Sequence, residues 1–372
     1  MTTTSDKDTS QATLPGRLGH PDLELRTDPR SDPRMVAALA AFGLDTAAAP
    51  PPMDSSAPRE TLLEFCAAAE TGFEAVFDAL MTGLPEISGL TRSTETIQGV
   101  DGNDIQLYIA RPADATGPLP CVLHIHGGGM VILRGVGAAY VRFREELAAT
   151  GVVVIGVEYR NGAGVLGNHP FPAGLNDCTS ALNWVHSHRD QLGVTTITVA
   201  GESGGANLAL ATTLKAKQDR HLHMIDGVYA MVPYISGAYG WSEADRVREL
   251  PSLIENDGYF ISCALMDIMV SVYDPDGSHS RDPLCWPYHA SPADLAGLPP
   301  HVISVNEVDP LRDEGLAYYR KLLHAGVNAT GRTVLGACHA GDLMFRTAIP
   351  DMYAATINDL HHFVASRQLP HP

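Results

Sequence analysis

Short apolar runs alternate with helical stretches from residue 103 to the end of the chain, and this alternation restricts the fold more than any other feature. The runs are rich in β-branched residues and end at Gly, Pro or a charged residue, as buried strands do. Such alternation is typical of α/β proteins, in which helices cover both faces of a mostly parallel sheet. Sites in these sheets form at the carboxyl ends of the strands. The runs are NDIQLYIAR, CVLHIHG, GVVVIGVEY, TITVAGE, GVYAMVP and HVISVNE.

Apolar residues at helical spacing lie before and between these runs. From residue 61 to residue 81 they recur every three or four positions, which describes an amphipathic helix. Further helices are predicted in NDCTSALNWVHSH and in GANLALATTLKAK. The remaining predicted helical faces are Tyr140, Phe143 and Leu147; Leu316, Tyr319 and Leu323; and Tyr353, Ile357, Leu360 and Val364.

Composition and connection length divide the chain into five segments. The beginning is rich in Ser, Thr, Asp, Ala and Pro without an apolar period, which indicates an arm. More than sixty residues separate the strand that ends at Pro233 from the strand near His301. Because connections that long usually contain structure of their own, we predict inserted helices that form a lid. The predicted segments are the N-terminal arm (1–60), an N-terminal helix that contributes to the lid (61–94), the first part of the core (95–234), the lid insertion (235–298) and the second part of the core (299–372).

Charge and composition exclude several classes of partner. The net charge is -18 and the sequence pI is near 5.2, which disfavours binding to nucleic acid or to an anionic membrane surface. No apolar stretch reaches the roughly 18 residues of a membrane span, and the start MTTTSDKDTSQATLPG has no signal-peptide pattern. We therefore expect a cytoplasmic protein. The six cysteines contain no CxxC pair, which favours reduced, buried thiols over disulfides or a zinc site.

A GxSxG pattern, GESGG, lies between a predicted buried strand and a predicted apolar helix. Its serine is Ser203. Small neighbours allow a tight strand-to-helix turn that exposes the serine hydroxyl above the sheet. The pattern alone has weak specificity, but this position between a strand and a helix is the one that a nucleophilic serine requires. Ser203 is therefore the predicted nucleophile.

A nucleophilic serine needs a base to take its proton and an acid or carbonyl to orient the base. His339, in VLGACHAGD, follows a predicted strand and precedes the last helix. Asp309, in VISVNEVDPLRDEG, also follows a strand. The order Ser, Asp, His is that of α/β-hydrolases. The competing acids are Glu307 and Asp313, and the competing bases are His361 and His362, which fall inside the last predicted helix.

Three consecutive glycines end the stretch VLHIHGGGM. Backbone N–H groups stabilise the oxyanion of acyl transfer only where no side chain blocks the approach. We predict that Gly128, Gly129 and Gly204 supply these donors. A phosphate cradle is disfavoured because the run has no GK[ST] ending and does not fit GxGxxG, and a flexible turn is the other alternative. His126 is expected to anchor the loop by hydrogen bonding, with His124 on the opposite side of the strand.

The substrate pocket is harder to assign than the catalytic groups. Aromatic and methionine side chains of the insertion are suited to an acyl or alcohol pocket, although for any single one the core of the lid is the favoured role. The tentative pocket residues are Met130, Tyr234, Tyr239 and Trp241.

The motifs HGGGM, EYR, HPFPAGLNDC, GESGGANLA, DPLRDEG and CHAG together resemble the hormone-sensitive lipase family of α/β-hydrolase esterases, over residues 95–368. The resemblance implies an α/β-hydrolase fold with a lid made from the N-terminal helices and the insertion. It also implies a carboxylesterase with Ser203, Asp309 and His339 as its catalytic triad. Two departures are GESGGA in place of the family's usual GDSAGG, and NGAGVLGN in place of a shorter LAPE link.

The expected chemistry is a two-step acyl transfer from a small-molecule ester, without a metal or an organic cofactor. Short to medium acyl esters and a lactone are both compatible with it. Two alternatives stay open: a noncatalytic small-molecule receptor on the same fold, and an acyltransferase or amidase with the same triad. The late run ATGRTVLG is an expected sheet edge, through which a homodimer could form.

Overall fold

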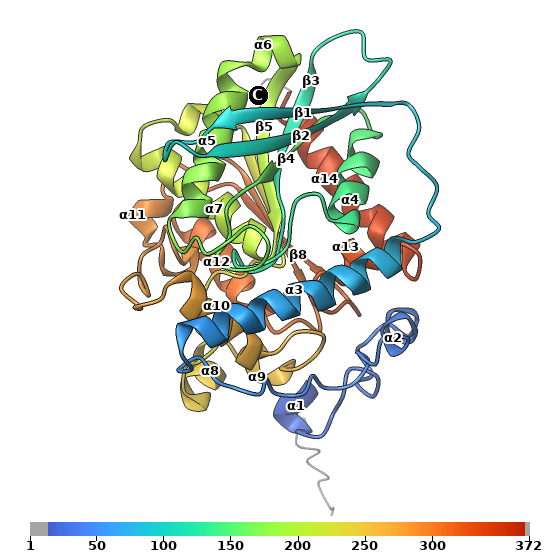
Figure 1. Ribbon diagram of the computed structural model, residues 1–372, viewed down its shortest axis with the longest axis vertical. Helices are drawn as coiled ribbons and strands as arrows, with labels where there is room; N and C mark the ends of the chain where they lie inside the picture. Colours follow the sequence, from blue (N-terminus) through green and yellow to red (C-terminus); the bar gives the residue numbers. More distant parts are fainter. Residues whose placement is uncertain (1–13, 369–372) are drawn as a thin grey trace, which may run out of the picture.

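One eight-stranded sheet forms the centre of the molecule, in a computed structural model that describes residues 14–368 (Figure 1). The strands are β1 (Leu90–Gln98), β2 (Asp104–Pro112), β3 (Leu119–Ile125), β4 (Val153–Glu158), β5 (Val194–Glu202), β6 (Gly227–Met231), β7 (His301–Asn306) and β8 (Ala329–Val334). Their order is β1-β2-β4-β3-β5-β6-β7-β8. β2 runs antiparallel to β1 and β4, and the remaining pairs are parallel. The predicted α/β fold with a mostly parallel sheet is confirmed. Residues 1–13 of the predicted arm and residues 369–372 of the predicted core lie outside the described residues.

β1 is the strand that the apolar pattern did not predict. Its sequence, LTRSTETIQ, is mostly polar, and only Ile97 is buried. The strand pairs along its whole length with β2, from Leu90 opposite Pro112 to Gln98 opposite Asp104. Pairing with a neighbour, rather than its own hydrophobicity, makes this segment a strand.

Helices cover both faces of the sheet, as predicted (Figure 1). On one face lie α4 (Ala138–Ala148) and α14 (Pro350–Ser366), and on the other lie α5 (Ala173–Ser187), α7 (Gly204–Gln218) and α12 (Arg312–His324). Two short helices, α6 (Arg189–Leu192) and α13 (Gly341–Met344), belong to the connections. The predicted face of the last helix is confirmed, because α14 buries Tyr353, Ile357, Leu360 and Val364.

The buried face of α12 differs from the predicted face by one position. The predicted face included Leu323, whose exposed fraction is 47%. The buried face instead contains Gly315, Tyr318 and Leu322. Gly315 decides the rotation of the helix, because a Cβ there would lie 2.5 Å from a methyl group of Val305 in β7. The helix therefore approaches the sheet along its glycine.

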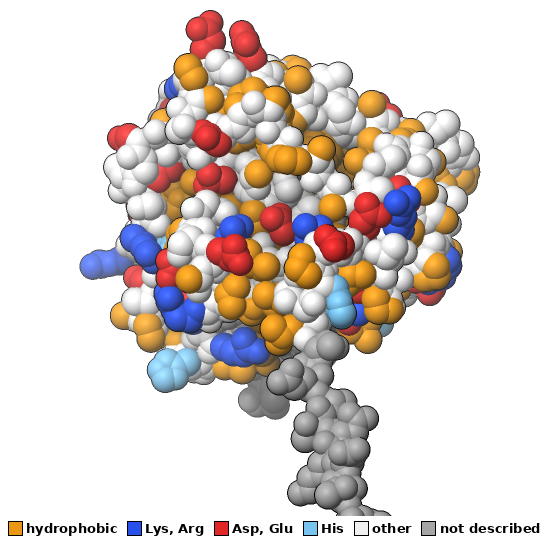
Figure 2. Space-filling view, turned by 90° about the horizontal axis from the view of Figure 1, so that it is seen from below, with side chains coloured by type: hydrophobic (Ala, Val, Ile, Leu, Met, Phe, Trp, Pro, Cys, Tyr) orange, Lys and Arg blue, Asp and Glu red, His pale blue; other side chains and the backbone are white. Residues whose placement is uncertain are grey.

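α3 (Arg59–Met81) runs across the carboxyl ends of the parallel strands, at the bottom of Figure 1, where the predicted amphipathic helix is confirmed. The insertion lies beside it, and α10 contacts α3. Seen from below, this side of the molecule carries hydrophobic, acidic and basic side chains intermixed (Figure 2). The helices of the insertion are α8 (Glu243–Glu249), α9 (Ser252–Glu255), α10 (Cys263–Tyr273) and α11 (Pro292–Leu295).

The described part of the arm packs against the insertion and against the loop after β8. Met35 and Leu39 are fully buried. The Asp32 N–H donates to the carbonyl of Gly336, at 2.9 Å, just beyond β8. This contact ties the arm to the loop that carries His339. The arm contains α1 (Gly16–Gly19) and α2 (Pro33–Ala40).

The cysteines are small core residues. All six are buried, and none is paired in a disulfide. Within residues 14–368, none of the helices combines the length and the apolar character that a bilayer-spanning segment needs. In the same part of the chain, no three or more His, Cys, Asp and Glu side chains are grouped so that they could hold a metal ion.

Glu70 fastens α3 to the rest of the molecule. Its buried carboxylate accepts the N–H of Leu133 and the N–H of Val165, both at 2.7 Å. Glu70→Leu leaves both donors without an acceptor, so we expect the free energy of unfolding in urea to fall by about 2–5 kcal/mol. The control is Glu74→Ala, because Glu74 pairs with Arg134 near the surface and its loss should cost less than about 1 kcal/mol. Equal losses in the two variants would contradict this role of Glu70.

Candidate active site

Ser203 occupies a strained turn between β5 and α7. Its φ is 55° and its ψ is -119°, a region that non-glycine residues rarely adopt. The two glycines of the motif allow the turn to pack closely. A Cβ on Gly205 would lie 1.9 Å from the carbonyl oxygen of Ile125, and a Cβ on Gly201 would lie 2.3 Å from that of Gly205. Larger residues at either position would push the turn away from β3.

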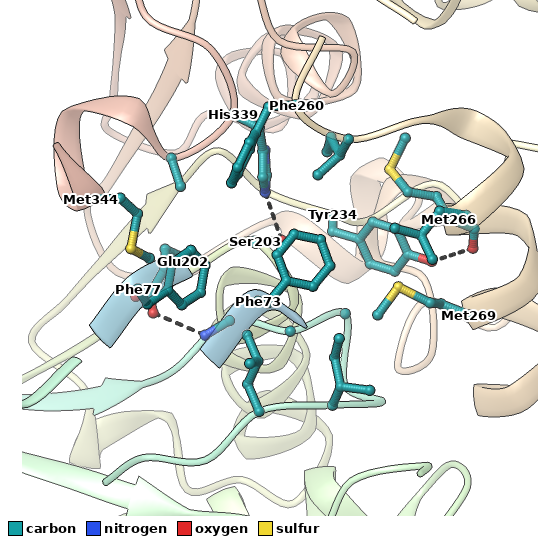
Figure 3. A pocket seen from close by; sticks show the side chains of 18 of the residues that line it. Phe73, Phe77, Glu202, Ser203, Tyr234, Phe260, Met266, Met269, His339 and Met344 are labelled. Atoms are coloured by element: carbon teal, nitrogen blue, oxygen red, sulfur yellow. Dashed lines mark hydrogen bonds between the residues drawn. The ribbon is translucent and has the colours of Figure 1, made fainter. Parts of the chain in front are cut away.

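The structure brings the three predicted catalytic residues together. His339 Nε2 lies 2.9 Å from Ser203 Oγ (Figure 3). On the other side of the ring, His339 Nδ1 lies 2.9 Å from Asp309 Oδ2. Asp309 follows β7 and is fully buried, and its Oδ1 accepts the N–H of Leu311 at 2.8 Å. His339 follows β8 and is 6% exposed. The three side chains therefore form one connected hydrogen-bonding row at the carboxyl ends of the strands.

The competing residues make other contacts. Glu307 Oε2 accepts the N–H of Gly336, at 2.9 Å. Asp313 Oδ2 accepts the N–H of Ser252, at 2.8 Å. The two histidines of α14 also lie elsewhere: His361 Nδ1 lies 2.9 Å from Thr150 Oγ1, and His362 is exposed.

Glu202 holds the glycine loop against the serine turn. Its Oε1 accepts the N–H of Gly127, at 2.9 Å (Figure 3). Its Oε2 lies 2.8 Å from His124 Nε2. His126 packs on the other side, with its ring stacked on Tyr159 at 4.3 Å between centroids. The Nδ1 atom of His126 lies 2.9 Å from the Gly127 carbonyl oxygen. The two histidines thus anchor the loop from opposite sides of β3.

The predicted oxyanion donors lie side by side. A Cβ on Gly204 would lie 2.6 Å from the backbone nitrogen of Gly129, so the two segments approach at backbone distance. Gly128 and Gly129 have φ of +103° and +61°, and a Cβ on Gly128 would meet the Ile132 carbonyl oxygen at 2.0 Å. Within residues 14–368, no acceptor takes the N–H of Gly128, Gly129 or Gly204. These groups are available to a ligand oxygen.

A cavity with about 600 Å³ of empty space lies above Ser203 and His339. Tyr234 lines it, as expected, and donates its hydroxyl to the Met266 carbonyl at 2.8 Å. Much of the wall comes from α3 and the insertion (Figure 3). The sequence analysis assigned these segments to a lid but did not identify which of their residues face the cavity. Apolar side chains of the same types are found in protein cores and in pocket walls. The wall residues from these segments include Phe73, Phe77, Phe260, Met266 and Met269.

The other three tentative pocket residues are not among the residues that line the cavity. Met130 is fully buried at the end of the glycine loop. Tyr239 stacks behind Tyr234, at 4.6 Å between ring centroids. The ring of Trp241 packs against Arg281, whose guanidinium carbon lies 5.2 Å from the ring centroid. Each packs against protein, so the expectation for these three residues needs correction.

The arm and the insertion hold the loops of Asp309 and His339 from outside the sheet. Asn256 Nδ2 donates to the carbonyl of Asp309, at 3.0 Å, and its Oδ1 accepts from Arg30 Nη2, at 2.9 Å. Met35 Sδ accepts the N–H of Cys338, at 3.3 Å. Arg30 and Met35 lie more than 200 positions before the residues that they contact here. Asn256 is nearer to Asp309, but no sequence motif links the two residues.

A sequence profile described as an α/β-hydrolase fold matches residues 122–342, which is more than half of the chain. The chain belongs to the α/β-hydrolase fold family. Carboxylesterase NlhH of Mycobacterium tuberculosis is 33% identical to this hydrolase over 250 residues, which cover 66% of this chain and 73% of the relative. An arylesterase of Saccharolobus solfataricus is 32% identical over 222 residues, which cover 59% of this chain and 67% of the relative.

The hydrolase is also similar to the solved structure of brefeldin A esterase, described as a bacterial homologue of human hormone sensitive lipase. The two chains share 49% sequence identity and superpose with a TM-score of 0.93, over 95% of this chain and 99% of the other. The resemblance to the hormone-sensitive lipase family is confirmed. The predicted enzyme class, a carboxylic ester hydrolase, is confirmed as well.

Glu314 is a buried carboxyl group behind the cavity wall of this hydrolase. Its oxygens accept the N–H of Ile235, at 2.6 Å, and the hydroxyl of Tyr239, at 2.9 Å, and they contact the Ser236 hydroxyl at 2.5 Å. Burial raises the pKa of Glu314 to about 8. A carboxyl group whose pKa is raised by folding stabilises the folded state fully below its unfolded pKa of about 4.5. That contribution is lost as the pH rises toward the folded pKa.

Glu314→Gln removes this pH dependence and keeps a hydrogen-bonding group in place. Between pH 4.5 and pH 8 the wild type loses stability and the variant does not, so the free energy of unfolding of the variant relative to wild type should increase. The increase should be about 1.4 kcal/mol for each unit by which folding raises the pKa of Glu314. Urea denaturation at several pH values measures it. Glu249→Gln, at an exposed carboxyl group, is the control and should leave the pH curve unchanged. Parallel curves for wild type and Glu314→Gln would refute the assignment.

Proposed function

We propose that this esterase is a serine carboxylesterase in which Ser203 is the nucleophile, His339 the general base and Asp309 the group that orients the base. The observation that carries the proposal is the connected row of these side chains, with both distances at 2.9 Å. A base within hydrogen-bonding reach of the hydroxyl, itself oriented by a buried carboxylate, is the arrangement that activates serine.

The first step forms an acyl-enzyme. Ser203 Oγ attacks the ester carbonyl carbon while His339 Nε2 takes the hydroxyl proton. Asp309 accepts the Nδ1–H hydrogen bond, which fixes the tautomer and stabilises the imidazolium. His339 then gives the proton to the departing alcohol oxygen, and the carbonyl reforms as a serine ester.

The second step releases the acid. A water molecule gives its proton to His339 and attacks the acyl carbon, and the proton returns to Ser203 as the carboxylic acid leaves. In both steps the carbonyl oxygen becomes an oxyanion. We assign its donors to the N–H groups of Gly128, Gly129 and Gly204, and each such donor contributes roughly 3 kcal/mol in the transition state.

The cavity favours esters with a short to medium acyl chain. Its walls are mostly aromatic and aliphatic, which suits the burial of an acyl chain. A lactone is the second substrate class, on the likeness to a brefeldin A esterase. A noncatalytic receptor has no need for an activated serine. The similarity to esterases favours neither that receptor nor an acyltransferase or amidase.

Two finer assignments accompany this proposal. We place the esterase in the cytoplasm, on its composition. We also propose a homodimer through the free edge of β8, which pairs on one side with β7 and leaves most of its own residues at least partly exposed.

The triad is tested with a chain-length series of p-nitrophenyl esters. Ser203→Ala and His339→Ala each remove a group that acts in the transition state, so we expect kcat to fall about 10⁴-fold or more. The wild type should hydrolyse esters with acyl chains from acetyl through hexanoyl faster than the palmitoyl ester. His361→Ala is the matched control and should keep wild-type rates, because His361 contacts Thr150 and does not line the cavity above Ser203.

A wild type that binds these esters without turning them over would favour the receptor instead. Full activity of Ser203→Ala would refute the nucleophile, and full activity of His339→Ala would refute the base.

Asn256 offers a test of how the acid loop is held. Asn256→Leu removes the amide that donates to the Asp309 carbonyl and accepts from Arg30. Because small misplacements of catalytic groups are costly, we expect kcat to fall about 10- to 100-fold with little change in KM. Asn176→Leu, at an amide that contacts Asp101 on the surface, is the control. A variant that changes KM alone would contradict a positioning role.

A further inference from the structure

The guanidinium of Arg144 lies in a groove beside β1 and β2, apart from the active-site cavity. Arg144 belongs to α4, and only 4% of the residue is exposed. It lines a groove with about 770 Å³ of empty space. The described residues that line this groove and those that line the active-site cavity are two separate sets. The groove is therefore a second concave site, independent of the proposed catalytic function.

The sheet is shaped to receive this guanidinium. Gly156 interrupts the apolar run of β4, and Tyr108 of β2 lies opposite it in the strand register. A Cβ on Gly156 would lie 2.7 Å from Arg144 Nε. The guanidinium carbon lies 5.6 Å from the centroid of the Tyr108 ring, as in a cation–π contact. A glycine in the strand thus leaves the space that the guanidinium fills.

The charge of Arg144 has no hydrogen-bonding partner in the described part of the chain. Its Nη1 is buried without an acceptor, and none of the hydrogen bonds or ion pairs there involves its guanidinium. The nearby carboxylate of Glu158 is already engaged, by the Tyr108 hydroxyl at 2.9 Å and the Gly135 N–H at 2.7 Å. Burial lowers the pKa of Arg144 to about 10, which leaves it cationic at neutral pH. Carboxylates nearby, Glu158 and Glu202 among them, act on this charge, but no described acceptor takes a hydrogen bond from the guanidinium. Buried donors of this kind are costly unless an acceptor meets them.

The other residues that line the groove indicate which further chemical groups a ligand would carry. Arg92 also lines it, but its guanidinium pairs with Glu145, at 2.6 Å, so those two charges cancel. Ile109, Val136 and Val141 supply apolar surface, and 45% of Val136 is exposed. The groove therefore combines a guanidinium that makes no hydrogen bond within residues 14–368 with an apolar wall, in a chain whose net charge is -18.

We propose that this groove is a binding site for a small organic carboxylate with a short apolar tail. The carboxylate accepts hydrogen bonds from the planar fork of Arg144, and the tail packs against Ile109, Val136 and Val141. Arginine suits this role better than lysine, because its fork matches the two oxygens of a carboxylate. The short tail follows from the extent of the apolar wall.

A thermal-shift titration with sodium butyrate, at constant ionic strength and pH, tests the site. We expect wild type to bind butyrate with a Kd of about 1 mM, as suits a ligand of this size. Acetate, which lacks most of the tail, and inorganic phosphate, which lacks all of it, should each bind about tenfold more weakly. Arg144→Met should weaken butyrate binding about tenfold or more, and Arg144→Lys by less.

Two further variants locate the binding. Val141→Trp narrows the groove and keeps Arg144, and it should also weaken butyrate binding about tenfold, which tests the site if Arg144→Met does not fold. Arg92→Gln is the control, because that charge is already paired, and it should leave the affinity within about twofold. Absence of butyrate binding to wild type overturns the proposal. Binding that survives both Arg144→Met and Val141→Trp does so too, because it places butyrate elsewhere. Phosphate affinity equal to that of butyrate overturns the assignment of an apolar tail.

Discussion

The backbone contact between the Ser203 turn and the end of β3 is the constraint on which the site depends. Gly205 packs so closely that a Cβ would lie 1.9 Å from the Ile125 carbonyl oxygen. The contact holds Ser203 at a φ of 55°, at a typical cost of about 1–3 kcal/mol. It also places the Gly204 and Gly129 backbones together. One close approach therefore positions both the exposed hydroxyl and the free N–H groups, and the buried strands and helices around it supply the stability that sustains the strain.

The loops that carry Asp309 and His339 depend on a different kind of support. Asp309 and His339 lie beyond the ends of β7 and β8, where the sheet no longer holds the backbone. The arm and the insertion take over that task. Arg30 contacts Asp28, Glu255 and Asn256, and Asn256 holds the Asp309 carbonyl. Since buried charges are costly unless they are paired, these cross-links specify how the segments fit together more than they stabilise the fold.

Much of the fold and of the hydrogen-bonded row of Ser203, His339 and Asp309 could be predicted because each depends on local chemistry. Buried strands must be apolar, and a serine in a tight turn needs small neighbours. The pocket wall could not be predicted. Tyr239 and Trp241 are close in sequence to Tyr234, yet they pack behind the wall or away from it. Phe73 and Phe77 line the cavity because α3 crosses the strand ends, and an amphipathic helix has the same sequence pattern wherever it docks.

The sequence by itself determined the strand and helix alternation, the elbow at Ser203 and the identity of its partners Asp309 and His339, because these follow from residue types at short spacing. Only the tertiary structure decided that the polar segment β1 is a strand, that α12 faces the sheet along Gly315, and that Arg144 lies against Gly156. Each of these depends on contacts between segments far apart in the chain. The free energy of such a contact depends on both residues that make it. The sequence around either residue alone therefore does not reveal the contact.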